Sequence, residues 1–266
     1  MQRRSILLAG LALTPVSAAF AAVSPGGMKR LRVGADSALI ASGLAGALQR
    51  AFERDTGIPV EGVGGPALPL LDALVAGELD AALLNAGEPE LARQREGLVH
   101  DRQPIALGDF VLVGRRLGGR GRRGGAGNAA SALARWAQAA QTAPAAVFLS
   151  ANDGSGTHLA EQALWRAAGI APQAPWYRAA REPARLIGEA RRLGAHAVVE
   201  RGAWSAHGGG PLAILAGGDA ALLERVHAMR SFRSPHPAGK LFVGWIAGAR
   251  GRAVVVRQQG YRAPAG

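Results

Sequence analysis

Residues 150–158 read SANDGSGTH and stand between an apolar run at 145–149, which predicts a strand, and a helical pattern from about 156 to 168. The first N–H groups of a helix have no partners inside it, and the helix dipole places partial positive charge there. Glycines let an anion approach the backbone closely, and the hydroxyls of Ser155 and Thr157 add donors, so this turn can hold an anion. An Asp or Ser at a helix start also caps the helix without binding anything, so the rest of the chain must decide.

Predicted strands and helices alternate on both sides of this turn. Strands are expected at 31–34, 58–63, 80–84, 109–114, 145–149 and 195–200, and helices at 43–54, 68–78, 131–141, 156–168, 183–193 and 237–249. Within the first of these helices, Leu44, Leu48 and Phe52 are spaced four apart and share one face. The alternation predicts an α/β fold in which helices cover both faces of mostly parallel sheets.

The composition indicates a chain that folds around a core of its own. It has 266 residues, of which 48% are hydrophobic, and this is enough for two lobes. There is no cysteine, which excludes disulfides. The net charge of +12 favours anionic partners, but the surplus is almost all arginine in a sequence rich in Ala and Gly, so charge alone names no ligand.

The first residues have the pattern of an export signal. Arg3 and Arg4 precede an apolar run, and Ala19-Phe20-Ala21 supplies a small-x-small cleavage site, so we expect a signal peptide at 1–21. The paired arginines also fit a twin-arginine signal, and both the Sec route and the twin-arginine route stay open. The apolar run is shorter than the roughly 20 residues that a spanning helix needs. A periplasmic protein that is not embedded in the membrane is therefore expected.

Two other functional classes are weaker on the sequence. Ser155 with His158 could form a serine hydrolase pair, but Thr157 breaks the G-x-S-x-G pattern and Asp153 lies on the wrong side of the turn to orient the imidazole. The Gly and Arg segment at 117–130 lacks the stacking aromatics of RNA-binding segments, so it predicts a flexible surface loop and no nucleic-acid partner. The remaining histidines show no metal-ligand spacing, and no metal or cofactor is expected: His100, His196, His207, His227 and His236.

Several short segments occur in an order that carries a resemblance. They are SGL at 42–44, DTGIPV at 55–60, GE at 77–78 with Asp80, DFVLVG at 109–114, DGSGTH at 153–158, Glu161, Trp165, GI at 169–170, WY at 176–177 and ERG at 200–202. None of these segments is specific by itself, and only their order and combination indicate a family. From about residue 31 to 258 the chain resembles the periplasmic tungstate-binding proteins of ABC importers.

The resemblance implies a two-lobed type II periplasmic binding fold with a mixed, mostly parallel sheet in each lobe. Lobe 1 would comprise 29–111 and 208–262, and lobe 2 would comprise 112–207. It further implies a monomeric, non-enzymatic solute-binding component that closes on a tetrahedral oxyanion, first of all tungstate, and delivers it to a permease subunit. Another oxyanion, such as molybdate or a phosphate-like ion, or a different ligand is the alternative, and a hydrolase using Ser155 ranks below both.

The chain departs from the family pattern where the ligand would bind. Ala35, Asp36, Ser37 and Ala38 stand where these proteins carry Thr-Thr-Thr-Ser, and Ala151 stands where an arginine is expected. In one account Arg181, Arg185 or Arg201 supplies the missing charge and Asp36 accepts a hydrogen bond from a protonated oxyanion. In the other, the site has drifted to another ligand or to none. The expected ligand-binding residues are Ser37, Asp36, Ser155, Gly156, Thr157 and Arg201.

Overall fold

The structure is a computed structural model, and it describes residues 29–115, 128–143, 145–208, 210–234 and 236–265. The signal peptide expected at 1–21 and most of the loop expected at 117–130 lie outside these residues. Residues 128–130 of that predicted loop are instead helical or capping, because the Asn128 side chain accepts a hydrogen bond from the Ser131 amide and starts the helix there.

One mixed sheet runs through the molecule, and its strand order is β2-β1-β3-β9-β4-β7, with β8 also paired to β4. Its strands are β1 (Leu31–Asp36), β2 (Val60–Gly65), β3 (Ala81–Leu84), β4 (Val99–Gly114), β7 (Ala197–Glu200), β8 (Ala213–Ala216) and β9 (Leu223–Ser231). β1 is parallel to β2 and β3, whereas β9 is antiparallel to β3 and β4, and β4 is antiparallel to β7 and β8. A separate parallel pair joins β5 (Phe148–Ser150) to β6 (Tyr177–Ala179).

This topology confirms the α/β class and corrects the prediction of a mostly parallel sheet in each lobe. The reason is the length of β4, which has 16 residues where the sequence predicted six, at 109–114. Its first part pairs with β9 and its end pairs with β7 and β8, so the two halves of the sheet are joined through one strand.

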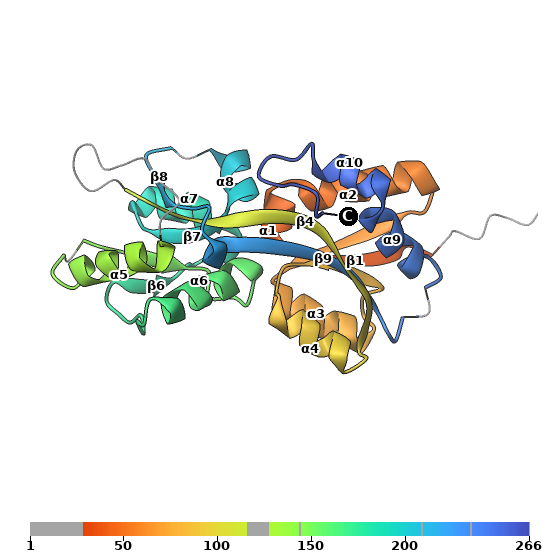
Figure 1. Ribbon diagram of the computed structural model, residues 1–266, viewed down its shortest axis with the longest axis horizontal. Helices are drawn as coiled ribbons and strands as arrows, with labels where there is room; N and C mark the ends of the chain where they lie inside the picture. Colours follow the sequence, from red (N-terminus) through yellow and green to blue (C-terminus); the bar gives the residue numbers. More distant parts are fainter. Residues whose placement is uncertain (1–28, 116–127, 144, 209, 235, 266) are drawn as a thin grey trace, which may run out of the picture.

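Helices gather at the two ends of β4 and β9, as Figure 1 shows, with α2, α3, α4, α9 and α10 at the β1 end and α5, α6, α7 and α8 at the β7 end. Their bounds are α1 (Ser37–Ala41), α2 (Leu44–Thr56), α3 (Ala67–Ala76), α4 (Glu88–Arg95), α5 (Ala129–Ala140), α6 (Gly156–Ala167), α7 (Leu186–Leu193), α8 (Arg201–His207), α9 (Ala238–Ala247) and α10 (Ala249–Val255), with short 3-10 turns η1 (Pro183–Arg185) and η2 (Ala220–Leu222). In the described part of the chain, none of these helices is both long and apolar enough to cross a membrane.

Each end of the molecule has its own core. At the β1 end the predicted face of α2 is confirmed, since Leu44, Leu48 and Phe52 are all buried, and the ring of Phe52 meets that of Phe242 edge-on at 5.0 Å between centroids. At the β7 end, aromatic rings from α5, β5 and α6 pack together, with those of Phe148 and Trp165 centred 4.9 Å apart.

Two short helices at the centre of the molecule were not predicted, and both begin at a buried carboxylate. The Asp36 side chain caps α1 by accepting from the Ala38 amide at 2.9 Å. The Glu200 side chain caps α8 by accepting from the amides of Gly202 and Ala203. Helices of five and seven residues are too short to show a helical period, so the sequence alone does not predict them.

Candidate functional site

The turn before α6 has the strand-turn-helix form that the sequence predicts, and its own side chains hold it in shape. The Ser155 hydroxyl accepts from the His158 amide at 3.2 Å, and the Asp153 carboxylate accepts from the Ser155 amide at 2.9 Å. Gly154 adopts a left-handed conformation with φ of 80°, and its amide donates to Nδ1 of His158 at 3.1 Å. These three hydrogen bonds hold the turn together and cap the start of α6.

The same bonds disfavour the hydrolase alternative. The hydroxyl of Ser155 meets the backbone of His158, while the imidazole of His158 is turned to the Gly154 amide. Burial also lowers the pKa of His158. A general base must lie within hydrogen-bond reach of its nucleophile. In the described part of the chain, the His158 imidazole makes no hydrogen bond with the Ser155 hydroxyl.

Asp36 occupies a place that the sequence did not predict. Its carboxylate is fully buried, and it accepts from the Gly156 amide at 3.2 Å and from the Ala38 amide at 2.9 Å. Burial raises the pKa of Asp36 to about 6, although the amides of Ala38, Gly156 and Ala67 pull it down. Near neutral pH, one of the first amides of α6 therefore holds a carboxylate of the protein itself. Asp36 does not line the adjoining cavity.

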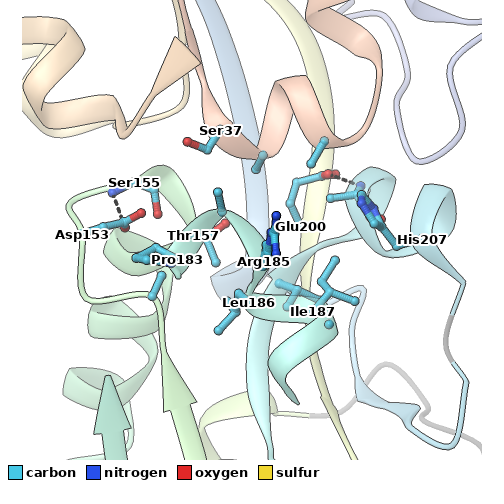
Figure 2. A pocket seen from close by; sticks show the side chains of 17 residues that line it. Ser37, Asp153, Ser155, Thr157, Pro183, Arg185, Leu186, Ile187, Glu200 and His207 are labelled. Atoms are coloured by element: carbon cyan, nitrogen blue, oxygen red, sulfur yellow. Dashed lines mark hydrogen bonds between the residues drawn. The ribbon is translucent and has the colours of Figure 1, made fainter. Parts of the chain in front are cut away.

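A cavity of about 210 Å³ adjoins the start of α6 (Figure 2). Ser37 and two alanines of α1 form one wall, and Thr157 of α6 and its N-cap residue Ser155 lie across from them. The other walls come from residues 183–188, in η1 and α7, and from the junction of β7 and α8. Three of the predicted residues, Ser37, Ser155 and Thr157, are thus brought together from segments more than 100 residues apart.

Gly156 lies behind this wall, in close contact with Asn85. A Cβ atom added at position 156 would overlap the side-chain amide of Asn85. The Asn85 amide nitrogen in turn donates to the Glu224 carboxylate at 2.6 Å, and burial raises the pKa of Glu224 well above its usual range. Only glycine fits this position without moving a buried, hydrogen-bonded side chain.

The structure does not bring Arg201 to the cavity. The Arg201 guanidinium forms a bidentate ion pair with the carboxylate of Asp109 in β4, with Nη2 2.6 Å from Oδ2. Arg201 is not among the residues that line the cavity. The arginine that lines the cavity is Arg185, whose side chain is 78% exposed and pairs with Glu182 at 3.1 Å. The charge expected from Arg201 is therefore already neutralised.

Most residues of the cavity wall are not predicted from the sequence. Leu186, Ile187 and Val199 line the cavity and also belong to the core of the β7 end, and nothing in the sequence distinguishes them from other core residues. Glu200 also lines it, and burial raises the pKa of Glu200 to about 7. The ERG segment at 200–202 was the available signal for Glu200. Among the described residues, no three side chains of His, Asp or Glu are grouped closely enough to hold a metal ion.

The buried carboxylates predict how stability depends on pH. Burial raises the pKa of Glu161 and of Glu200 to about 7 from 4.5, so the folded chain keeps two protons that the unfolded chain releases near 4.5. The free energy of unfolding should therefore fall as the pH rises from about 5 to 7, by up to about 1.4 kcal/mol per pH unit for each group.

Urea unfolding of wild type and Glu161→Gln across this range measures that slope. His196, whose pKa burial lowers to about 4, opposes the trend below about pH 6.5, so the difference between the two proteins is the useful quantity. The variant should show the shallower decline. Equal slopes would contradict a protonated Glu161 in the folded state.

Comparisons with known proteins agree with this architecture. The chain matches the PBP (periplasmic binding protein) superfamily domain over residues 21–221. It is 28% identical to the tungstate-binding protein TupA of Peptoclostridium acidaminophilum over 166 residues, which are 61% of this chain and 56% of that protein. The chain spans a little over half the length of the curated relatives it matches.

Solved structures extend the likeness to nearly the whole chain. The structure of the tungstate ABC transporter from Geobacter sulfurreducens is 26% identical, with a TM-score of 0.71 over 86% of this chain and 98% of that one. The tungstate-binding protein TupA from Desulfovibrio alaskensis G20 shares the fold at 24% identity, with a TM-score of 0.67 over 89% of this chain and 99% of that one. The family match covers well over half of the sequence, and the chain therefore belongs to the PBP superfamily.

Proposed function

We propose that this chain is the periplasmic solute-binding component of an ABC importer and captures a small oxyanion by closure of two lobes. The observation that best supports the proposal is the cavity itself, which Ser37 lines from one side and Ser155 and Thr157, at the start of a twelve-residue helix, line from the other (Figure 2). Tungstate is the first candidate, because the names of two similar proteins specify it. Molybdate and phosphate-like ions are the alternatives.

The two lobes of this proposal follow the two ends of the sheet. We keep 29–111 in lobe 1 and 112–207 in lobe 2, and extend lobe 2 to residue 222. The reason is that β8 pairs with residues 112–114 of β4, and η2 contacts α5 and α6. β4 and β9 then act as the hinge strands. Closure around them would exclude water and strengthen charge-assisted hydrogen bonds to the anion.

The ligand contacts in this proposal come from both lobes. Ser37 donates from lobe 1, and Ser155 and Thr157 donate from lobe 2. The Gly156 amide contributes less than the sequence suggested, because it is shared with Asp36. Arg185 supplies positive charge at the rim, where its exposure makes the contribution modest.

Calorimetric titration of the mature protein with tungstate, molybdate, phosphate and sulfate tests the proposal. Thr157→Val and Ser37→Ala each remove one hydroxyl from the cavity. Each should lower the affinity for the tightest-binding anion by roughly tenfold, the usual effect of losing a charge-assisted hydrogen bond. Thr142→Val removes an exposed hydroxyl outside the cavity and should change nothing. Absence of heat with all four anions and also with small monoanionic oxyacids such as methanesulfonate, up to about millimolar concentration, would rule out the proposal.

A further inference from the structure

We propose that the ligand of this cavity is a monoanionic oxyacid that carries a short alkyl group, rather than a bare inorganic dianion. This inference rests on the proposed function and names the class of ligand for the same site. It follows from three properties of the described residues: the balance of charge around the cavity, the aliphatic side chains in its walls and its volume.

The charge around the cavity is unfavourable to a dianion. Asp153 and Glu200 line the cavity, and the buried Asp36 lies just behind the start of α6. The cation among the lining residues is Arg185, which is exposed and already paired with Glu182. Each of these carboxylates that is ionised repels an anion, as Asp36 is above about pH 6, and a second charge on the ligand doubles that cost. One negative charge is therefore better matched to this site than two.

Position 151 carries an apolar side chain where the tungstate-binding family is expected to carry an arginine. The side chain of Ala151 is buried and lines the cavity. It continues an aliphatic wall formed by Leu186, Ile187 and Val199. An inorganic oxyanion has no group that gains from contact with such a wall, whereas an alkyl chain releases water from it.

The hydroxyls that line the cavity and the aliphatic side chain of Ile187 lie in different parts of it. Figure 2 shows Ser155 and Thr157 towards the left, and Ile187 towards the right, below Glu200 and His207. A ligand with a charged head and an alkyl tail can contact the hydroxyls and Ile187 at once. The charged head would bind at the hydroxyls, and the tail would point to α7.

The volume leaves room for such a tail. A cavity of about 150 Å³ lined by Leu, Ile and Phe accommodates benzene. The present cavity is about 210 Å³. It can therefore hold a tetrahedral head and several carbon atoms.

A series of alkanesulfonates tests the inference, because the head group and its single charge stay constant while the tail grows. The mature protein is titrated with methane-, ethane-, propane- and butanesulfonate, and with sulfate, at constant ionic strength. We expect each added methylene to tighten binding about fourfold, the effect of burying one CH₂ group. Butanesulfonate should bind more tightly than sulfate.

Ala41 provides a matched pair of variants. It is half-buried in α1 and lines the cavity, so Ala41→Leu fills space with three further carbons, whereas Ala41→Ser hardly changes the volume. Ala41→Leu should abolish the gain with chain length and leave methanesulfonate binding within about threefold of wild type, if one buried methylene corresponds to about fourfold. Ala41→Ser should keep the full series. Thermal unfolding of both variants checks that they are folded.

The outcomes separate this inference from the proposed function. If sulfate or tungstate binds and affinity is flat or falls with chain length, the alkyl group has no place in the site and the inference is overturned, while the proposed function stands. A gain that persists in Ala41→Leu also overturns the inference, because the tail then binds elsewhere. If neither the inorganic anions nor the sulfonates bind, both are overturned.

Discussion

Replacing Asp36 by asparagine should raise the affinity of the protein for divalent oxyanions at about pH 7.5 by at least tenfold, or about 1.4 kcal/mol. At that pH Asp36 is ionised, because its pKa is about 6. Two unit charges 4 Å apart interact by about 4 kcal/mol near a protein surface, so the loss of this carboxylate beside the cavity is a large change for a dianion. The measurement is calorimetric titration of both proteins with sulfate and tungstate.

Asp72→Asn is the matched control, since Asp72 is exposed on α3 and the same charge is removed away from the cavity. It should leave the affinity unchanged at physiological ionic strength, where exposed charges are screened. An equal gain in both variants would mean that net charge alone governs binding. No gain in Asp36→Asn would contradict the position of the carboxylate at the start of α6.

Replacing Gly156 by alanine should destabilise the protein by about 3 kcal/mol or more. The new methyl group would overlap the side chain of Asn85, and overpacking of a dense interior costs about 1–3 kcal/mol by itself. Moving Asn85 also breaks its bond to the buried Glu224, and an unsatisfied buried group costs about 1–3 kcal/mol more. Urea unfolding followed by circular dichroism measures the change.

Gly244→Ala provides the comparison. Gly244 lies in the exposed part of α9, and an added Cβ meets nothing within 4 Å. Alanine is the better helix former by about 1 kcal/mol, so this variant should be slightly more stable than wild type. If Gly156→Ala were as harmless as Gly244→Ala, the close contact of α6 with Asn85 would be wrong.

Local features of the fold were predictable from the sequence because their causes are local. The turn at 150–158 was predicted from a strand pattern, its glycines and an N-cap within a few residues, and the face of α2 from the spacing of Leu44, Leu48 and Phe52. The pairing of β4 with β9 was not predictable in this way, since the paired residues are more than 100 positions apart. A sequence that is read in short windows therefore shows the elements but not the sheet that joins them.

In the candidate site, too, residues in one local turn were predictable, whereas the effects of distant partners were not. Ser155 and Thr157 were predicted to line the ligand pocket from their own turn, and they do line the cavity. Arg201 was expected at the ligand, but its partner Asp109 lies 92 positions earlier in the chain, and only the fold reveals the pair. The bond between Asp36 and Gly156 spans 120 positions. Charge neutralisation across such separations decides which predicted residues remain available to a ligand.

Membership in the PBP superfamily leaves the choice of ligand to the residues of the cavity. Ala151 and Asp36 each lower the positive charge at the place where an anion would bind, while Leu186 and Ile187 add apolar surface. These four residues are the basis for the proposed preference for a monoanion with an alkyl group over a small dianion.

One diffraction experiment tests whether a small anion binds between the proposed lobes at the start of α6. Tungsten scatters anomalously, and so does the bromine atom of 2-bromoethanesulfonate, so crystals of the mature protein grown with about millimolar concentrations of either anion, at the weak end of measurable affinity, will reveal where it binds. We expect an anomalous peak in the cavity between Ser37 and Thr157, with Arg201 still bound to Asp109. A peak at another place, or no peak with either anion, would contradict binding at this site.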